Sequence, residues 1–415
     1  MATKWRLRLP PLDLPLALAA LGLMAIGLLM VFSATSVPGA HHGLWTRQLV
    51  WAACALGAAW IVAGIHYRAY DALAWPLYGI ALLLLVLVLV MGSTAMGARR
   101  WLDLGPLRFQ PSEIAKIATV LVLARWFDNP KRDLRRFWHW LPPLLLTLAP
   151  FALVAKEPDL GTSLSFPAML VVMYFWAGMP LGQLLLGLTP VFAAGAYLLM
   201  RSQPGGLWFV LPVAAAIVAL WVAARPRLHV VFVVVLLNVA VCTVLPRVVD
   251  HLSDYQLRRI ETFLDPQGDP YGAGYQVIQS QIAIGSGGVA GKGYLKGTQK
   301  ALAFLPMRHT DFIFSVVGEE LGLGGALAVV LLYAVLILRG CRLALVARSG
   351  FASLLAVGLV AALFYQVMVN MLMTIGWAPV TGLPLPLISY GGTALIVNGI
   401  QIGLLQNVAL RRQEF

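Results

Sequence analysis

The sequence predicts an all-α polytopic membrane protein, and three observations point to this fold class. Of the 415 residues, 60% are hydrophobic and only 11% are charged, whereas a soluble domain carries about 25% charged residues. The mean hydropathy is +0.83, and a folded soluble chain of this length cannot bury so much apolar surface. Apolar runs near the roughly 20 residues that cross a bilayer recur along the chain. Soluble, disordered, collagen-like and coiled-coil proteins are therefore excluded.

Twelve apolar runs predict a bundle of about 12 transmembrane helices in one integral membrane domain, residues 1–415. The first run is too long for the core of a cleaved signal peptide, so we expect it to be retained. The fourth is short and contains Glu113 and Lys116, which a helix tolerates better inside a bundle than facing lipid. The expected spans are 14–34, 48–66, 72–92, 112–127, 139–156, 160–177, 181–200, 206–224, 228–248, 312–338, 352–376 and 385–409.

The distribution of basic residues predicts how the bundle lies in the membrane. Lys and Arg are enriched in short cytoplasmic loops, and with twelve spans the most basic loops and both chain ends fall on one side. We therefore expect both termini in the cytoplasm. Residues 93–111, with Arg99, Arg100 and Arg108, depart from this rule. Because the net charge of +13 is dispersed over many loops, it indicates topology, and we expect no nucleic-acid partner.

Several other classes of enzyme are disfavoured by what the sequence lacks. Cys54, Cys242 and Cys341 form no CxxC or other metal-ligand spacing, and their odd number gives no disulfide framework. The sequence has no HExxH, GxSxG or Ser–Lys motif of membrane proteases. We therefore expect neither a redox centre nor a protease of these designs.

One connection, residues 249–311, is much longer than the others and is expected outside the cytoplasm. Loops of such length are usually functional. Residues 277–284 have the pattern of a short amphipathic helix, and several glycines follow it. These glycines do not fit a nucleotide-binding phosphate loop, since two of the residues it requires are replaced. Two interpretations stay open: a compact turn, or a backbone nest near a phosphate with Lys292 or Lys296 as counter-charge.

Asp311 stands directly before a long apolar run, at the expected outer boundary of the membrane. One interpretation is a helix N-cap that interacts with the N-terminal dipole. The alternative is a general base with a partly desolvated carboxylate. Glu319 and Glu320 lie two turns further along, where carboxylates usually face a polar cavity or a partner. They can also brace a neighbouring broken helix.

Further polar segments converge on the same expected face. Glu113 and Lys116 have the i,i+3 spacing at which a helix pairs opposite charges. Glu157 and Asp159 lie between the fifth and sixth spans, and residues 381–396 form a Pro- and Gly-rich bend before the last span. This constellation indicates an extracytoplasmic site but does not by itself identify a substrate.

Five long segments carry a resemblance to a known family. They are WLDLGPLRFQPSEIAK (101–116), EPDLGTS (157–163), AGYQVIQSQIAIGSGGVAGKGYLKGTQ (273–299), LPMRHTDFIFSVVGEELGLGG (305–325) and GLPLPLISYGG (382–392). Together, and in this order, they resemble the SEDS family (shape, elongation, division and sporulation). GKGYLKGTQ and GLPLPLISYGGT are most similar to its RodA branch rather than to its division paralogue FtsW. The resemblance covers the chain from the first span to the last.

The resemblance implies a peptidoglycan glycosyltransferase that polymerises lipid II during cell elongation and rod-shape maintenance. Members of the family act on the outer side of the bacterial inner membrane, with a class B penicillin-binding protein as transpeptidase and with the elongation machinery. The resemblance makes Asp311 the catalytic residue. It assigns Trp101, Glu113, Lys116 and Asp159 to the lining of the central cavity.

One departure from the family concerns the number of spans. The SEDS family usually has ten, so the resemblance implies that residues 203–248 are an inserted two-helix hairpin. Two added helices do not change the side on which later loops lie. The loop 249–311 is therefore still expected in the periplasm.

The implied chemistry is an inverting glycosyl transfer. Asp311 takes the proton from the 4-hydroxyl of an acceptor N-acetylglucosamine, and undecaprenyl diphosphate leaves the donor N-acetylmuramic acid. The leaving diphosphate needs positive charge, for which Lys116, Arg99, Arg100, Arg108 and a divalent cation (Mg²⁺ or Mn²⁺) are open candidates. The sequence establishes no cofactor. Two alternatives from other classes remain, a lipid II flippase and a scaffold that positions other wall enzymes.

Overall fold

The computed structural model describes residues 12–36, 43–95, 98–104, 107–129, 131–134, 136–202, 234–236, 238–241, 243, 262–263, 265, 268, 274–298 and 307–411. The chain divides into two compact units. The first comprises residues 1–130, 143–173 and 276–415, and the second comprises residues 131–142 and 174–275. All the candidate site residues named above belong to the first unit.

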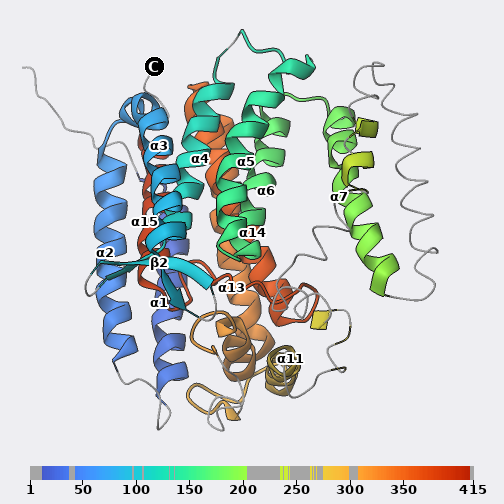
Figure 1. Ribbon diagram of the computed structural model, residues 1–415. Helices are drawn as coiled ribbons and strands as arrows, with labels where there is room; N and C mark the ends of the chain where they lie inside the picture. Colours follow the sequence, from blue (N-terminus) through green and yellow to red (C-terminus); the bar gives the residue numbers. More distant parts are fainter. Residues whose placement is uncertain are drawn as a thin grey trace, which may run out of the picture. The chain divides into compact units, whose positions relative to one another are not determined.

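The first unit is a bundle of helices that form where the sequence has its longest apolar runs (Figure 1). α2 packs against α15, α1 against α13 and α3 against α4, while α14 contacts both α4 and α13. The helices that lie wholly or mainly in this unit are α1 (Leu14–Thr35), α2 (Leu44–Gly64), α3 (Tyr67–Met91), α4 (Pro111–Phe127), α5 (Leu141–Lys156), α6 (Leu160–Trp176), α11 (Tyr275–Gly287), α13 (Ile313–Val346), α14 (Gly350–Thr374) and α15 (Gly392–Leu410).

The interior of this bundle is formed by α4, α14 and α15. In the most apolar window of α14 and of α15, 72% of the residues are buried, compared with 22% in α2. Almost every residue of α4 is buried, Glu113 and Lys116 included. The fourth span therefore packs inside the bundle, and this position explains why it tolerates two charges.

The prediction of a multi-pass helical membrane protein is confirmed. Among the described residues, six helices are long and apolar enough to cross a membrane, namely α1, α2, α3, α13, α14 and α15. α5, α6 and Leu181–Gly195 of α7 (Leu181–Ser202) are shorter apolar helices. The two spans expected at 206–224 and 228–248, and the proposed hairpin 203–248, lie almost entirely outside the described residues. The single integral domain 1–415 and the loop 249–311 stay predictions.

Among the expected helix bounds, two differ most from the structure. α13 continues to Val346 rather than ending at residue 338, because no Pro interrupts residues 339–346 and the single Gly340 does not end the helix. The last helix begins at Gly392 rather than at residue 385. Pro384 and Pro386 lack the backbone N–H that a helix interior needs, so the chain stays non-helical up to the bend before α15.

Residues 93–109, expected as a loop, contain a small antiparallel sheet with strand order β1-β2-β3 (Figure 1). Its strands are β1 (Ser93–Ala95), β2 (Ala98–Leu104) and β3 (Leu107–Phe109). Trp101 pairs with Ser93, and Asp103 pairs with Arg108. β2 contacts α3 and α4. The sheet therefore fixes the basic segment of this connection against the bundle.

α13 is interrupted at Gly322, whose φ of 65° lies in the left-handed region. A break frees carbonyl and N–H groups that hydrocarbon cannot satisfy. The loop after α11 supplies their partners: Lys292 N–H donates to the Glu319 carbonyl at 3.0 Å, and Leu323 N–H donates to the Gly288 carbonyl at 2.9 Å. The glycine-rich loop is thus a compact turn built around a broken helix.

α11 contains the whole of the short helix expected at 277–284. It lies at the opposite end of the first unit from the last turn of α15 (Figure 1). The second unit contains the short helix η1 (Phe137–His139) and α7. Leu186 and Val234 form a small buried cluster there, with Trp140 packed on it.

Candidate functional site

Asp311 lies on a turn that leads into α13. The helix begins at Ile313, and its N-cap position is Phe312, which makes no side-chain capping bond. The structure therefore does not place Asp311 at the N-cap, the first of its two interpretations. Asp311 is half-buried, as expected for a group that is partly desolvated yet accessible to a substrate.

The backbone of this turn is held by the bend that precedes α15. The Tyr390 N–H donates to the His309 carbonyl at 2.9 Å. The Ser389 hydroxyl donates to the Thr310 carbonyl at 2.6 Å. The rings of His309 and Tyr390 also meet edge to face, with their centroids 5.8 Å apart. The motifs at residues 305–325 and 382–392, which are far apart in the sequence, therefore form one local structure.

Asn370 of α14 completes this arrangement. Its side-chain Nδ2 donates to the Asp311 carbonyl at 2.9 Å and to the Leu383 carbonyl at 2.7 Å. Three successive carbonyls, those of residues 309–311, each accept a bond from a different residue. Asn370 was not predicted from the sequence, because a single Asn in an apolar run belongs to none of the recognised motifs.

A second group of polar side chains joins β2 to the start of α6. Arg100 Nε donates to the Glu157 carbonyl at 3.3 Å and lies 3.9 Å from Asp159 Oδ2. Asp159 accepts bonds from the Thr162 N–H at 3.2 Å and from the Thr162 hydroxyl at 2.9 Å. Gln110 Nε2 also donates to Asp159 Oδ2, at 3.5 Å. Asp159 thus caps the first turn of α6 while it faces the guanidinium of Arg100.

Glu157 belongs to the same group through its backbone carbonyl, which accepts the bond from Arg100. It is 1% exposed, and within the described residues neither of its carboxyl oxygens has a hydrogen-bond partner. Burial, reinforced by the negative charge of Asp159 and opposed by Arg100, raises the pKa of Glu157 from 4.5 to about 8. At neutral pH the carboxyl is therefore mainly protonated, and it adds little negative charge beside Arg100.

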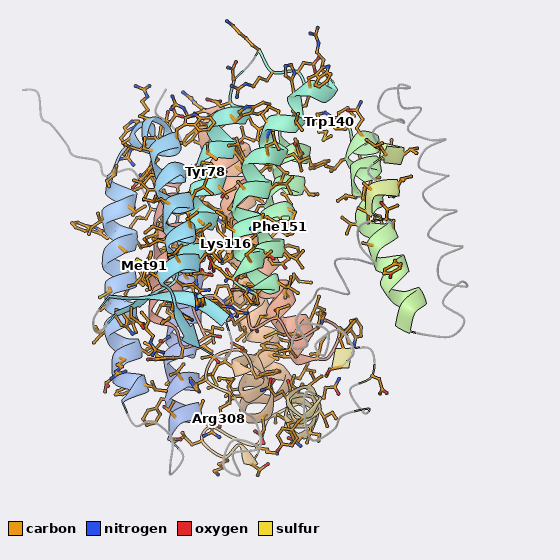
Figure 2. The ribbon with its side chains drawn as sticks, in the orientation of Figure 1. Tyr78, Met91, Lys116, Trp140, Phe151 and Arg308 are labelled. Atoms are coloured by element: carbon orange, nitrogen blue, oxygen red, sulfur yellow. The ribbon has the colours of Figure 1, made fainter. Side chains whose placement is uncertain are left out.

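Glu113 and Lys116 form the ion pair that their spacing predicts. Lys116 Nζ lies 2.9 Å from Glu113 Oε1, and the two side chains are 1% and 2% exposed. Figure 2 shows Lys116 in the middle of the bundle and Arg308 at the end that carries α11. Removing one member of such a buried pair leaves an uncompensated charge, which costs about 3–5 kcal/mol. The pair is therefore at least a structural element of α4.

The remaining candidates on the sheet are more accessible. Trp101 is half-buried. Arg108 lies 3.4 Å from Asp103, with 70% of its side chain exposed, and its carbonyl accepts a bond from the Thr393 hydroxyl at 2.7 Å. Arg99 is also exposed. Because side chains alternate along a strand, it lies on the opposite face of β2 from Arg100. Arg108 is thus tied by its backbone to α15, while its guanidinium stays accessible.

Lys292 braces the broken helix. Its Nζ lies 2.8 Å from Glu319 Oε1 and donates to the Thr298 hydroxyl at 2.7 Å. The Ser33 hydroxyl of α1 donates to Glu320 at 2.7 Å. Glu319 and Glu320 therefore brace a break in their own helix, α13, and not a neighbouring broken helix, as the sequence had suggested. Because Lys292 already pairs with Glu319, its assignment as a substrate cation stays a prediction that this geometry does not favour.

Within the part of the chain that the structure describes, no three His, Cys, Asp or Glu side chains gather closely enough to hold a metal ion. A divalent cation stays a prediction, and no chemical step is assigned to one.

Comparison with known proteins decides the family. The family model FTSW_RODA_SPOVE, described as cell cycle protein, matches residues 13–205 and 191–414. The chain belongs to this family. The resemblance to SEDS proteins is thereby confirmed over nearly the whole sequence.

Named relatives extend this result. The chain is 39% identical over 410 residues to peptidoglycan glycosyltransferase MrdB of Escherichia coli K12, an alignment that covers 97% of this chain and 94% of the relative. It is 34% identical over 410 residues to a probable peptidoglycan glycosyltransferase FtsW of Trichlorobacter lovleyi, again covering 97% of this chain and 94% of the relative. This chain is thus similar both to a relative named MrdB and to a relative named FtsW.

Solved structures confirm the fold. A chain of a peptidoglycan synthase complex that coordinates polymerization and crosslinking is 34% identical and superposes with a TM-score of 0.72, covering 97% of this chain and 99% of that one. The rod shape determining protein RodA of Thermus thermophilus is 29% identical, with a TM-score of 0.64 and coverage of 97% and 98%. The chain therefore has the fold of the SEDS family.

Proposed function

We propose that this protein is a peptidoglycan glycosyltransferase that polymerises lipid II during cell elongation and rod-shape maintenance. The names of the relatives support the reaction. The observation that carries the assignment to a site is the turn at Asp311, whose backbone is fixed at three successive carbonyls by two other parts of the chain. General-base catalysis requires such a fixed carboxylate, because the base must lie within hydrogen-bond reach of the proton it removes.

In the proposed reaction Asp311 acts as general base. Its carboxylate takes the proton of the 4-hydroxyl on an acceptor N-acetylglucosamine. The oxygen forms a bond to the anomeric carbon of the donor N-acetylmuramic acid, while the bond from that carbon to the diphosphate oxygen breaks. Undecaprenyl diphosphate leaves with the electron pair. One displacement converts an α-linked diphosphate into a β-glycoside, so the anomeric centre inverts.

The leaving diphosphate needs cations near its path. Lys116 is fully buried and paired with Glu113, so it serves only if the pair opens. Arg108 keeps most of its side chain exposed. Arg100 faces the Asp159 carboxylate at a distance of 3.9 Å, and the neighbouring Glu157 carboxyl is mainly neutral at pH 7. We therefore assign the electrostatic role first to Arg100 and Arg108, with Trp101 and Asp159 as neighbouring substrate contacts.

The membrane arrangement follows from the same proposal. The protein spans the bacterial inner membrane, with both termini in the cytoplasm and the site facing the periplasm. The placement of α11 and the last turn of α15 at opposite ends of the first unit supports this sidedness (Figure 1). The proposed partner is a class B penicillin-binding protein, a transpeptidase of the elongation machinery. The similar chain within a peptidoglycan synthase complex supports a partner of this kind.

A lipid II flippase is not favoured, because relatives that align over most of their length are named glycosyltransferases. A detergent assay separates the two functions, since detergent micelles offer no membrane to cross. Purified protein is incubated with lipid II and a class B partner whose transpeptidase is blocked, and glycan length is measured on a gel. We expect polymer and released undecaprenyl diphosphate. No polymer in detergent together with lipid II transfer in sealed vesicles contradicts the proposal.

A further inference from the structure

Gln48 of α2 is a buried polar residue that none of the recognised motifs contains. It is 1% exposed. Its side-chain Nε2 donates to the Ser389 carbonyl at 3.1 Å, and its Oε1 accepts from the Gly391 N–H at 3.4 Å. Both ends of one amide are therefore used by one bend, which lies more than 340 residues further along the chain.

Ser389 connects Gln48 to the turn that carries Asp311. Its hydroxyl accepts a bond from the Leu385 N–H at 2.8 Å and donates to the Thr310 carbonyl at 2.6 Å. The carbonyl of the same residue is the one that Gln48 holds. A continuous chain of hydrogen bonds thus runs from α2 through Ser389 to the residue next to Asp311.

The bend depends on side chains for its position. It has no regular secondary structure of its own before α15 begins at Gly392. It lies tightly on α2, since a Cβ added at Gly392 would lie 2.7 Å from the ring of Trp51. Packing determines the distance between the bend and α2, whereas the two hydrogen bonds of the Gln48 amide determine which backbone groups of the bend face α2. These bonds thereby also orient the Ser389 hydroxyl.

We propose that Gln48 is a positioning residue for glycosyl transfer. It fixes residues 389–391 and, through Ser389 and the Tyr390 N–H, it holds the carbonyls of the turn in the register that aims Asp311 at the acceptor hydroxyl. This inference rests on the proposed role of Asp311 as general base. Gln48 itself touches neither substrate nor reacting atoms.

Misplacing a catalytic group by about 1 Å can cost roughly 100-fold in rate. We therefore expect Gln48→Leu to lower kcat for lipid II polymerisation by about 10- to 100-fold, with KM unchanged within about threefold. A KM increase without a kcat loss would instead indicate altered substrate binding and would overturn the proposal. The control is Gln401→Leu in α15, because Gln401 is 2% exposed and, within the described residues, its side-chain amide has no hydrogen-bond partner. It should keep wild-type kcat.

A second measurement separates positioning from loss of folding. If Gln48 acts through Ser389, the kcat losses of Gln48→Leu and Ser389→Ala should not add in the double variant. Gln48→Glu keeps the length and an acceptor for the Gly391 N–H, so its kcat should lie between those of the wild type and Gln48→Leu. Additive losses, or equal kcat for Gln48→Leu and Gln401→Leu at equal folded fraction, would overturn the proposal.

Asp311→Asn is assayed in parallel. If it is inactive while Gln48→Leu has wild-type kcat, only the positioning role fails. If Asp311→Asn polymerises like the wild type, the proposed base fails, and the role of Gln48 fails with it.

Discussion

The Asn370 side chain donates one hydrogen bond to the backbone carbonyl of Asp311 and another to that of Leu383. It thereby joins α14, the turn before α13 and the segment before α15 at one point inside the bundle. Asp311 is half-buried, while Asn370 is fully buried. The position of the proposed base is therefore set from the interior of the protein and not by the turn alone.

Asn370→Ala tests this attachment. Losing two hydrogen bonds and leaving two carbonyls without this donor should destabilise the protein by about 1–3 kcal/mol. It should also lower the kcat for polymerisation by about 10-fold or more, because Asp311 is no longer held in place. Thermal unfolding in detergent and initial rates at saturating lipid II measure the two effects. Asn398→Ala in α15, another buried Asn, is the control. Equal kcat in the two variants would contradict the attachment.

Variants of the buried pair of Glu113 and Lys116 test whether the pair serves stability or the reaction. Lys116→Met should cost about 3–5 kcal/mol, since it leaves the Glu113 carboxylate buried without its cation. The double variant Glu113→Gln/Lys116→Met should recover most of that stability, and thermal unfolding measures the recovery. A folded double variant that makes no polymer would assign the pair to the reaction. If the double variant is as unstable as Lys116→Met, the ion pair is not the cause of the loss.

Glu157 predicts a pH dependence of stability. Its pKa in the folded protein is about 8, compared with 4.5 ordinarily, so the folded state binds the proton more tightly than the unfolded state does. Its contribution should therefore make the protein less stable as pH rises from about 4.5 to about 8 and change little beyond that. Glu157→Gln should remove this slope and raise the Tm above the wild-type value near pH 8. Wild-type and variant Tm curves that run parallel across this range would refute the assignment.

The break in α13 should tolerate no side chain at Gly322. Its φ of 65° is strained for other residues, and an added Cβ would collide with the backbone of Gly291. Gly322→Ala should therefore destabilise the protein by about 2 kcal/mol or more. Gly57→Ala is the matched control, because a Cβ there meets nothing within 4 Å and Ala favours a helix interior. Equal Tm values for the two variants would show that the break relaxes.

Hydropathy predicted most of the helices, because an apolar run of sufficient length must cross the bilayer or lie in the bundle. The amphipathic pattern at 277–284 predicted α11. Hydropathy did not predict β2, because strands of three to seven residues interrupted by Arg and Asp do not stand out from a polar loop. The start of the last helix was misplaced because hydropathy does not register that Pro384 and Pro386 prevent helix formation.

The candidate site was predicted unevenly for a similar reason. Residues within long motifs, such as Asp311 and Asp159, were recognised from their neighbours in sequence. Gln48 and Asn370 were not, since their partners lie far away in the chain and a single amide in an apolar run has no local pattern. The pairing of Lys292 with Glu319 depends on the break in α13, which the sequence did not reveal. Contacts between distant segments are what the structure adds.

The central claim is that Asp311 is the general base, and the most direct test compares Asp311→Asn with Asp71→Asn. Asp71 of α3 pairs with Arg125 at 3.0 Å and lies outside the candidate site, so its variant controls for the loss of one carboxylate. Initial rates of polymerisation are measured with purified lipid II at equal folded fraction. We predict a loss of at least about 100-fold for Asp311→Asn, the lower range for a general base, and near wild-type activity for Asp71→Asn. Equal rates for the two variants would contradict the account.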